Sequence, residues 1–189
     1  MEKLPSSEQL KDELARVRYR INFRKALRST VYALITVAAV AVLVAVFIMP
    51  VLRIYGSSMT PTVNEGDYVV SLKGTDLEAG DVIAFYYNNK ILVKRVIAFA
   101  GDWIDIDDQG NVYVNNVLLD EPYIAEKAFG DCNISLPYQV PESRVFVMGD
   151  HRSVSVDSRN SAVGCVAEEQ IVGRIVFRIW PLGVIGAIR

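Results

Sequence analysis

Three short segments contain the side chains of this chain that are best suited to chemistry. The first, residues 56–62, contains Ser58, whose hydroxyl is a candidate nucleophile. The second contains Lys94 within the apolar run 91–97, and the third is the polar stretch 149–159. A serine attacks a carbonyl group only when a base takes its proton, and an amine of lowered pKa is one such base. Taken alone, each segment is more typical of an ordinary loop, a solvated strand lysine or a polar turn than of a catalytic site.

Lys94 has an unusual setting for a cation. Alternate residues of a strand share a face, so Lys94 lies beside Leu92 and Val96. On an apolar face a lysine either extends its amine to water or is buried with a lowered pKa. With an unperturbed pKa of ~10.4, only about one lysine in 2,500 is neutral at pH 7. Arg95, on the opposite face, would lower the pKa of Lys94 further unless a carboxylate neutralises it.

The composition excludes several classes of protein. The chain of 189 residues has one His and two Cys, too few for a zinc or iron–sulfur site built from protein ligands. We therefore expect no metal and no other cofactor. A formal net charge of −2 argues against a nucleic-acid-binding protein.

An uncharged run follows a basic segment near the start of the chain. Residues 1–30 carry eight Lys or Arg against four Asp or Glu, and residues 29–52 carry no charge. The apolar core of this run would be ~33 Å long as a helix, enough to cross a bilayer core of ~30 Å. A cleaved secretory signal has a shorter apolar region, and a buried core helix usually keeps a polar face. The helix is expected to begin upstream, where Ser6 and Gln9, which follow Pro5, resemble a capping box.

The rest of the chain has the pattern of short strands separated by Gly, Asn and Asp. This pattern predicts a mostly β domain, an antiparallel sheet or barrel, tethered by one N-terminal transmembrane helix. We expect residues 1–29 to be a basic cytoplasmic tail, 30–52 the transmembrane helix and 53–189 an extracytoplasmic domain with an irregular insertion at 120–143. The strands are predicted over residues 67–72, 81–87, 91–99, 103–106, 111–115, 144–148 and 171–177.

Together, the order of these segments resembles that of the type I signal peptidases, in their smaller Gram-positive-like form. These are Ser/Lys membrane proteases that cut exported preproteins. The resemblance runs from the anchor to about Gly164. It rests on Ser-Met-x-Pro-Thr at 58–62, Lys-Arg-Val at 94–96 and Gly-Asp-x-Arg-x-x-Ser-x-Asp-Ser-Arg at 149–159. Residues 80–85 and 119–124 are also similar to segments of the family.

The resemblance assigns roles to individual residues. Ser58 matches the nucleophile and Lys94 the general base, so the chain is expected to be a serine endopeptidase. Ser155 matches a serine that orients the lysine, and the supporting ion-pair residues are Asp150, Asp157 and Arg159. The family's apolar substrate cleft corresponds to Leu52, Ile54, Met59, Leu92, Val93 and Val156. The implied partners are signal peptides of exported preproteins and the lipid bilayer of the cell membrane, with no nucleic acid and no metal.

Two positions depart from the family pattern. Gly56 stands where the best-known members have a serine that adds an oxyanion contact, which leaves the second oxyanion donor unassigned, with Ser57 as one candidate. His151 stands where an asparagine is usual, and it is interpreted as a turn residue because Lys94 already fits the base. The spacing of Cys132 and Cys165 does not decide between a disulfide and two free thiols.

Two rival functions come from other classes. A self-cleaving Ser/Lys repressor is similar in fold, but it would need a DNA-binding domain in place of the anchor. A membrane-tethered β module for binding or structure would not need Ser58 or Lys94 for its function.

Overall fold

The computed structural model describes residues 7–188, so Ser6 of the predicted capping box lies outside the described residues. The chain forms two compact units, which divide between Phe47 and Ile48. The helix ends at Ile48 and Val51–Arg53 form a strand, so the helix stops short of the predicted bound at Leu52. The assignment of the two units to the membrane and the outside stays a prediction.

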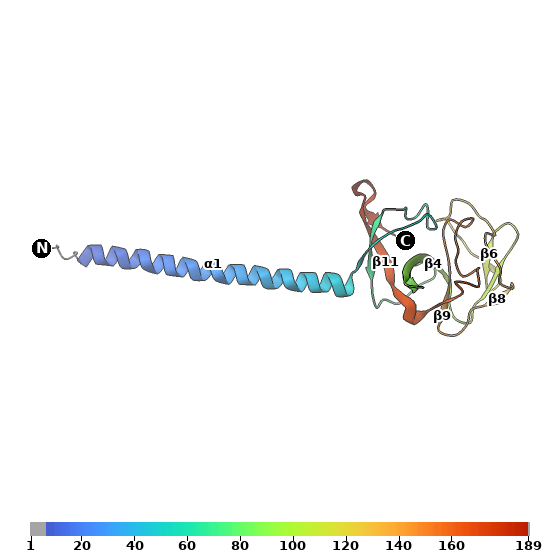
Figure 1. The fold of residues 1–189 in the computed structure, drawn as a ribbon, viewed down its shortest axis with the longest axis horizontal. Helices are drawn as coiled ribbons and strands as arrows, with labels where there is room; N and C mark the ends of the chain where they lie inside the picture. The colour runs from blue at the N-terminus through green and yellow to red at the C-terminus, as the bar shows by residue number, and fades with distance from the viewer. Residues whose placement is uncertain (1–6, 189) are drawn as a thin grey trace. The chain divides into compact units, whose positions relative to one another are not determined.

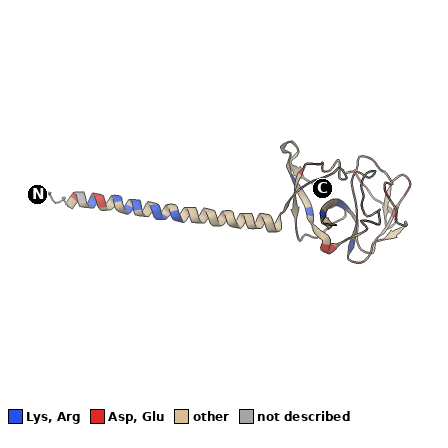
Figure 2. Ribbon diagram, viewed as in Figure 1, with Lys and Arg blue, Asp and Glu red and all other residues tan. Residues whose placement is uncertain are grey.

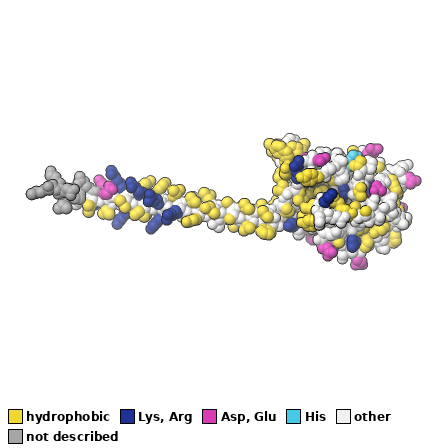
Figure 3. All heavy atoms as spheres, viewed as in Figure 1, with side chains coloured by type: hydrophobic (Ala, Val, Ile, Leu, Met, Phe, Trp, Pro, Cys, Tyr) yellow, Lys and Arg dark blue, Asp and Glu magenta, His cyan; other side chains and the backbone are white. Residues whose placement is uncertain are grey.

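The first unit is formed by α1 (Ser7–Ile48), which is helical well upstream of the apolar run, as expected (Figure 1). Lys and Arg side chains are confined to its part up to Arg28, and residues 29–48 carry no charge (Figure 2). No residue of its most apolar stretch is buried, and apolar side chains form the outer surface of this stretch (Figure 3). Because this stretch is exposed, α1 is not a buried core helix. It is long and apolar enough to cross a membrane.

The second unit is built from short antiparallel strands, which confirms the predicted fold class. Their bounds are β1 (Val51–Arg53), β2 (Tyr68–Leu72), β3 (Val82–Tyr87), β4 (Lys90–Ala98), β5 (Trp103–Ile106), β6 (Val112–Val114), β7 (Val117–Leu118), β8 (Tyr138–Gln139), β9 (Arg144–Met148), β10 (Val166–Ala167), β11 (Ile171–Trp180) and β12 (Gly186–Ala187). Two 3-10 turns, η1 (Glu168–Gln170) and η2 (Leu182–Val184), flank β11.

Within the described residues the strands form two sheets. The larger has eight strands in the order β1-β2-β11-β3-β4-β9-β10, with β12 paired to β11, and the smaller has the order β7-β6-β5-β8. The long strand β11 pairs with β2, β3 and β12, with register shifts that let it bend between them. The larger sheet brings β4, which carries Lys94, between β3 and β9.

Paired asparagines make the tight turns of two hairpins. Asn88 and Asn89, between β3 and β4, have φ values of 43° and 61°. Asn115 and Asn116, between β6 and β7, have φ values of 51° and 66°. Two consecutive residues of positive φ are typical of the turn that best matches the twist of a hairpin, and Asn tolerates this conformation. The first turn fixes the register that pairs Lys94 with Ile83.

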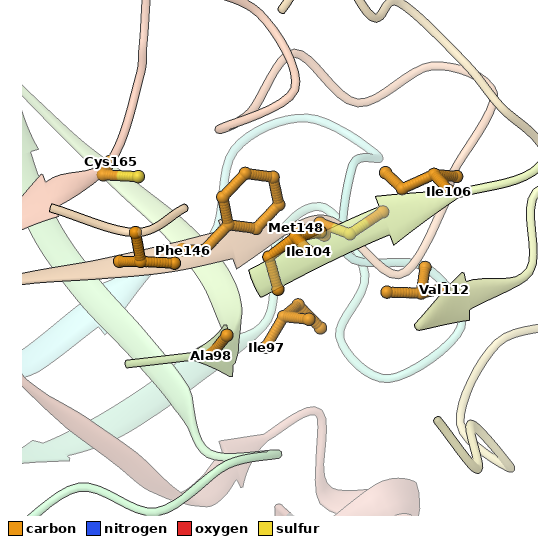
Figure 4. Packing of buried hydrophobic residues seen from close by; sticks show 9 residues of the cluster. Ile97, Ala98, Ile104, Ile106, Val112, Phe146, Met148 and Cys165 are labelled. Atoms are coloured by element: carbon orange, nitrogen blue, oxygen red, sulfur yellow. The ribbon is translucent and has the colours of Figure 1, made fainter. Parts of the chain in front are cut away.

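The second unit has a core made of three apolar clusters. One fills the space between β4, β5, β6 and β9, where Ile97, Ile104, Phe146 and Met148 converge (Figure 4). A second lies under the loop that carries Ser58 and includes Met59, which is 2% exposed. Both clusters fix elements of the site, the first by securing the C-terminal half of β4 and the second by anchoring the loop.

Candidate active site

Ser58 lies on the loop between β1 and β2, and its neighbours hold that loop in place. The side chain of Met59 is buried in the core, while Ser58 itself is only half-buried. Hydrogen bonds close the loop at its base, where the Ile54 N–H donates to the Asp67 carbonyl at 2.8 Å. A second bond, from the Val63 N–H to the Met59 carbonyl at 3.1 Å, forms a turn after the serine. The sequence therefore presents a serine hydroxyl from a rigid turn.

Lys94 points at this hydroxyl from β4. Its Nζ lies 2.6 Å from Ser58 Oγ, and the residue is 3% exposed. Burial lowers the pKa of Lys94 from 10.5 to about 8. The nearby Asp157 and Asp150 carboxylates oppose this by raising the pKa, and Arg159 adds to the lowering. An amine of that pKa is neutral often enough near pH 8 to take a proton from the serine.

The positive charge of Arg95, the neighbour of Lys94 in the chain, is paired with a carboxylate. It donates to both carboxylate oxygens of Asp150, Nε to Oδ1 at 2.9 Å and Nη2 to Oδ2 at 2.7 Å. Thr62 Oγ1 also donates to Asp150, at 2.5 Å, and Arg95 Nη1 donates to the Gly80 carbonyl. A carboxylate therefore neutralises Arg95, and burial is the largest cause of the lowered pKa of Lys94.

The loop after β9 is bonded to the backbone of Ser58 and to the carboxylate of Asp157. The His151 N–H donates to the Ser58 carbonyl at 3.0 Å. The Gly149 N–H donates to Asp157 Oδ2 at 2.9 Å. Gly149 has no room for a side chain, because an added Cβ would lie 2.2 Å from Ser155 Oγ and 2.5 Å from the Ser58 carbonyl oxygen. The loop therefore packs directly against the nucleophile's backbone.

Three buried arginine–carboxylate pairs hold this loop. Arg95 pairs with Asp150, Arg159 with Asp157 and Arg152 with Glu121. All six side chains are at most 1% exposed. Arg159 donates to both oxygens of Asp157, each at 2.9 Å. Burial alone would raise the pKa of Asp157, but these hydrogen bonds and the guanidinium charge hold it below its usual value.

Most of the predicted supporting residues converge on the dyad. Ser155 is buried beside Gly149, but its hydroxyl has no hydrogen-bond partner among residues 7–188, so its orienting bond to Lys94 stays a prediction. His151 contributes its backbone N–H, and Nδ1 of its ring has no partner in the same range. Ser57 is exposed, and the Ser58 N–H donates to no described acceptor, which leaves it free to bind an oxyanion.

A groove of about 620 Å³ runs alongside the dyad between β1 and β4. Both strands present free backbone edges to it, since β1 pairs only with β2 and the β4 residues before Arg95 pair only with β3. The groove is lined by Val51, Leu52, Arg53, Ile54, Tyr55, Gly56, Ser58, Met59, Lys90, Ile91, Leu92, Val93 and Lys94. Five of the six predicted cleft residues are in this set. Val156 is not, and its side chain is 48% exposed.

Two residues of the site make contacts that the sequence does not predict. Glu121 lies in the stretch predicted to be irregular, and only its place in a family-like segment marks it. Thr62 ends the Ser-Met-x-Pro-Thr motif, but the motif does not indicate that its hydroxyl donates to Asp150 and accepts from Arg95 Nη2 at 3.2 Å. Both residues contact partners that are far away in the sequence, so these contacts could not be predicted from local sequence.

In the described part of the chain, no side chains are arranged for metal binding or for catalysis by a thiol. Among these residues no group of three or more His, Cys, Asp or Glu is placed to hold a metal ion. Cys132 and Cys165 are both free thiols. Cys165 is buried, which raises the pKa of its thiol, and its Sγ lies 4.0 Å from the Tyr138 hydroxyl. Neither thiol is bonded to the dyad.

The chain is similar to several known proteins. The family model described as "Signal peptidase, peptidase S26" matches residues 27–180. Signal peptidase IB of Staphylococcus aureus strain Mu50 is 34% identical over 178 residues, which cover 84% of this chain and 92% of that protein. Thylakoidal processing peptidase 1, chloroplastic, of Arabidopsis thaliana is 34% identical over 142 residues, 66% of this chain, and the match spans 40% of that longer protein. A crystal structure of a signal peptidase I from Enterococcus faecalis V583 is 28% identical and covers 53% of this chain and 97% of its own, with a TM-score of 0.46.

Proposed function

Because this chain belongs to the signal peptidase family, peptidase S26, we propose that it cuts signal peptides with Ser58 as nucleophile and Lys94 as general base. The observation that carries the proposal is the 2.6 Å approach of Lys94 Nζ to Ser58 Oγ, with the amine held away from water. Family membership makes the protein a peptidase, and the dyad is our assignment of how it works. The rival of a tethered binding module is not favoured, since that function would not require this pairing.

The proposed reaction proceeds through an acyl-enzyme. Ser58 Oγ attacks the carbonyl carbon of the scissile bond while its proton passes to neutral Lys94 Nζ. The carbonyl electrons move to the oxygen, where the free Ser58 N–H donates to the developing charge. As the C–N bond breaks, the Lys94 ammonium returns the proton to the leaving amine. Neutral Lys94 then takes a proton from the water that attacks the ester, and this proton goes back to Ser58 Oγ.

The surrounding charges are proposed to position the dyad. The Asp157–Arg159 pair anchors the Gly149 N–H, and the neighbouring His151 N–H fixes the Ser58 carbonyl. The Asp150–Arg95 pair secures the same loop from the other face of β4. Ser155, which matches the orienting serine of the family, is proposed to bond the Lys94 amine during proton transfer. We assign these groups no bond-making step.

The free edges of β1 and β4 support an extended substrate. A chain laid between them would gain backbone hydrogen bonds as an added strand, and its alternate side chains would face the groove. Alternation makes the first and third positions before the cut share a face, so a shallow groove selects small residues at both. This is the pattern of residues at the end of a signal peptide that the family resemblance implies.

The membrane anchor is proposed to be part of the mechanism. The basic residues preceding the apolar stretch of α1 favour a cytoplasmic N-terminus, with residues 53–189 outside the cell membrane. Signal peptides emerge at that surface, so the anchor would hold the dyad where its substrates appear.

The decisive experiment is cleavage of a preprotein by the detergent-solubilised full chain. Ser58→Ala and Lys94→Ala should each lower kcat/KM by at least about a thousandfold, because each removes one half of the proton transfer. Ser135→Ala and Lys73→Ala, exposed residues of the same types, serve as matched controls and should keep wild-type rates. Near-full activity in Lys94→Ala would contradict the dyad and direct attention to His151.

A further inference from the structure

The segment 128–133 lies outside the three motifs and is hydrogen-bonded to Arg159, the arginine that neutralises Asp157. Arg159 Nη1 donates to the backbone carbonyls of Phe129 at 2.8 Å and Ala128 at 3.3 Å. Its Nη2 donates to the Arg152 carbonyl at 2.9 Å as well as to Asp157. With Nε also on Asp157, every nitrogen of the buried guanidinium has an acceptor. Two of these acceptors come from the segment 128–133.

Gly130 is where this segment comes closest to the arginine. Its φ is +68°, and a Cβ built on it would lie 2.5 Å from both Arg159 Nη1 and the Arg152 carbonyl oxygen. Real Cβ atoms do not approach other heavy atoms so closely, so any side chain at this position must displace Arg159 or the segment itself. The position therefore needs glycine both for its backbone conformation and for space.

Side chains also tie the segment to the loop that follows Arg159. The Asn133 N–H donates to the Arg159 carbonyl at 3.0 Å, and Asn133 Oδ1 accepts from the Ser161 N–H at 2.7 Å. Asn160 Nδ2 donates to Asp131 at 2.6 Å. The segment thus holds both the side chain and the backbone of Arg159.

We propose that the segment 128–133 is a positioning segment for the general base, which holds Arg159 on Asp157 and so sets the balance of charge around the Lys94 amine. The inference rests on the proposed Ser58–Lys94 function and adds to it a segment that positions the general base. None of these residues touches the dyad, so any effect must pass through Arg159.

The sign of the effect follows from the charges around Lys94. Asp157 and Asp150 raise the pKa of Lys94, while Arg159 lowers it. Arg95 lies on the opposite face and is neutralised by Asp150, and the other charged residues of the groove are Arg53 and Lys90. The loop after β9 adds the side chain of His151 to the groups around the site. If Arg159 moves away from Asp157, its lowering effect weakens and the carboxylate is less neutralised. Both changes raise the pKa of Lys94.

The test compares Gly130→Ala with Gly74→Ala in the detergent-solubilised full chain. Gly74 has nearly the same φ, +69°, but no atom within 4 Å of an added Cβ, so it reproduces the backbone strain without the collision. The readout is the pH at which kcat/KM for a preprotein reaches half its plateau. Gly130→Ala should raise this pH by about half a unit or more, which lowers kcat/KM at pH 7 at least about threefold. Its plateau at high pH should stay close to wild type, and Gly74→Ala should not shift.

Asn133→Ala provides a second test that changes no charge and introduces no collision. It removes the acceptor of the Ser161 N–H, and we expect a smaller shift in the same direction. This variant decides the question if Gly130→Ala does not fold. Activity that depends on Ser58 but shows an unmoved half-plateau pH in these variants overturns this inference alone. Activity that survives Ser58→Ala overturns the proposed function and this inference with it.

Discussion

At the scale of single residues, Lys94 has a buried amine whose charged form is poorly solvated. Its pKa is about 8 in the folded chain against 10.5 when free. Below pH 8 the amine is charged in both the folded and the unfolded state, and the folded state bears the full desolvation penalty. Between pH 8 and 10.5 the unfolded chain binds the proton more strongly, so stability rises with pH. The residue that the proposed chemistry requires therefore weakens the fold at neutral pH.

We expect Lys94→Met to stabilise the protein while it abolishes cleavage. The shift of the pKa corresponds to about 3 kcal/mol in the free energy of unfolding at pH 7, and this gain should shrink towards zero near pH 10.5. Unfolding of the detergent-solubilised chain can be followed by the fluorescence of Trp103 and Trp180, which both lie in the second unit. Lys90→Met, an exposed lysine of the same strand, is the control. A Lys94→Met protein less stable than wild type at pH 7 would contradict the expectation.

The reactive residues can be predicted from the sequence more readily than the residues that hold them in place. Ser58 and Lys94 are predictable because each lies in a short motif and the motifs occur in a recognisable order. Glu121 and Gly130 are not, because their importance comes from partners 31 and 29 residues away, Arg152 and Arg159. A buried ion pair leaves no periodic signal, and a glycine required for space looks like any turn glycine.

At the scale of elements, the free edges of β1 and β4 define the groove, and its lining side chains decide what fits. Leu92 lines it from β4, near the dyad. We expect Leu92→Trp to fill part of the groove and lower kcat/KM for a small-x-small substrate at least about tenfold. The loss should appear mainly in KM, since the tryptophan removes binding contacts rather than the proton transfer.

Val117→Trp is the matched control for Leu92→Trp. Val117 is 69% exposed on β7 of the smaller sheet, so a tryptophan there should not change cleavage. If Leu92→Trp leaves KM unchanged, the substrate does not lie in this groove.

Strands with alternating residues and clear turns are predictable, and those shaped by distant partners are not. The prediction locates β2, β3, β4, β5, β6, β9 and β11 because each is an apolar run between turn residues. It misses β1, β7, β8, β10 and β12, which have two or three residues each and too little pattern to detect. The stretch 120–143 takes its shape from contacts with the loop after β9, which local sequence does not encode.

At the scale of the whole molecule, the orientation in the membrane is a direct prediction. In intact cells a membrane-impermeant maleimide should label Cys132, which is partly exposed in the second unit, but not buried Cys165. In a Cys132→Ser background, Ser7→Cys should be labelled only after the cells are permeabilised, because the basic segment keeps the N-terminus inside. Labelling of Ser7→Cys in intact cells would reverse the orientation.

The apolar, outward-facing surface of α1 has a kinetic consequence. An enzyme anchored in lipid, acting on substrates that are also held in lipid, meets them by lateral diffusion in two dimensions. The rate then depends on the number of copies per unit area of bilayer and not on their number per litre. Adding empty vesicles that fuse with the loaded ones would slow cleavage while every bulk concentration stays the same.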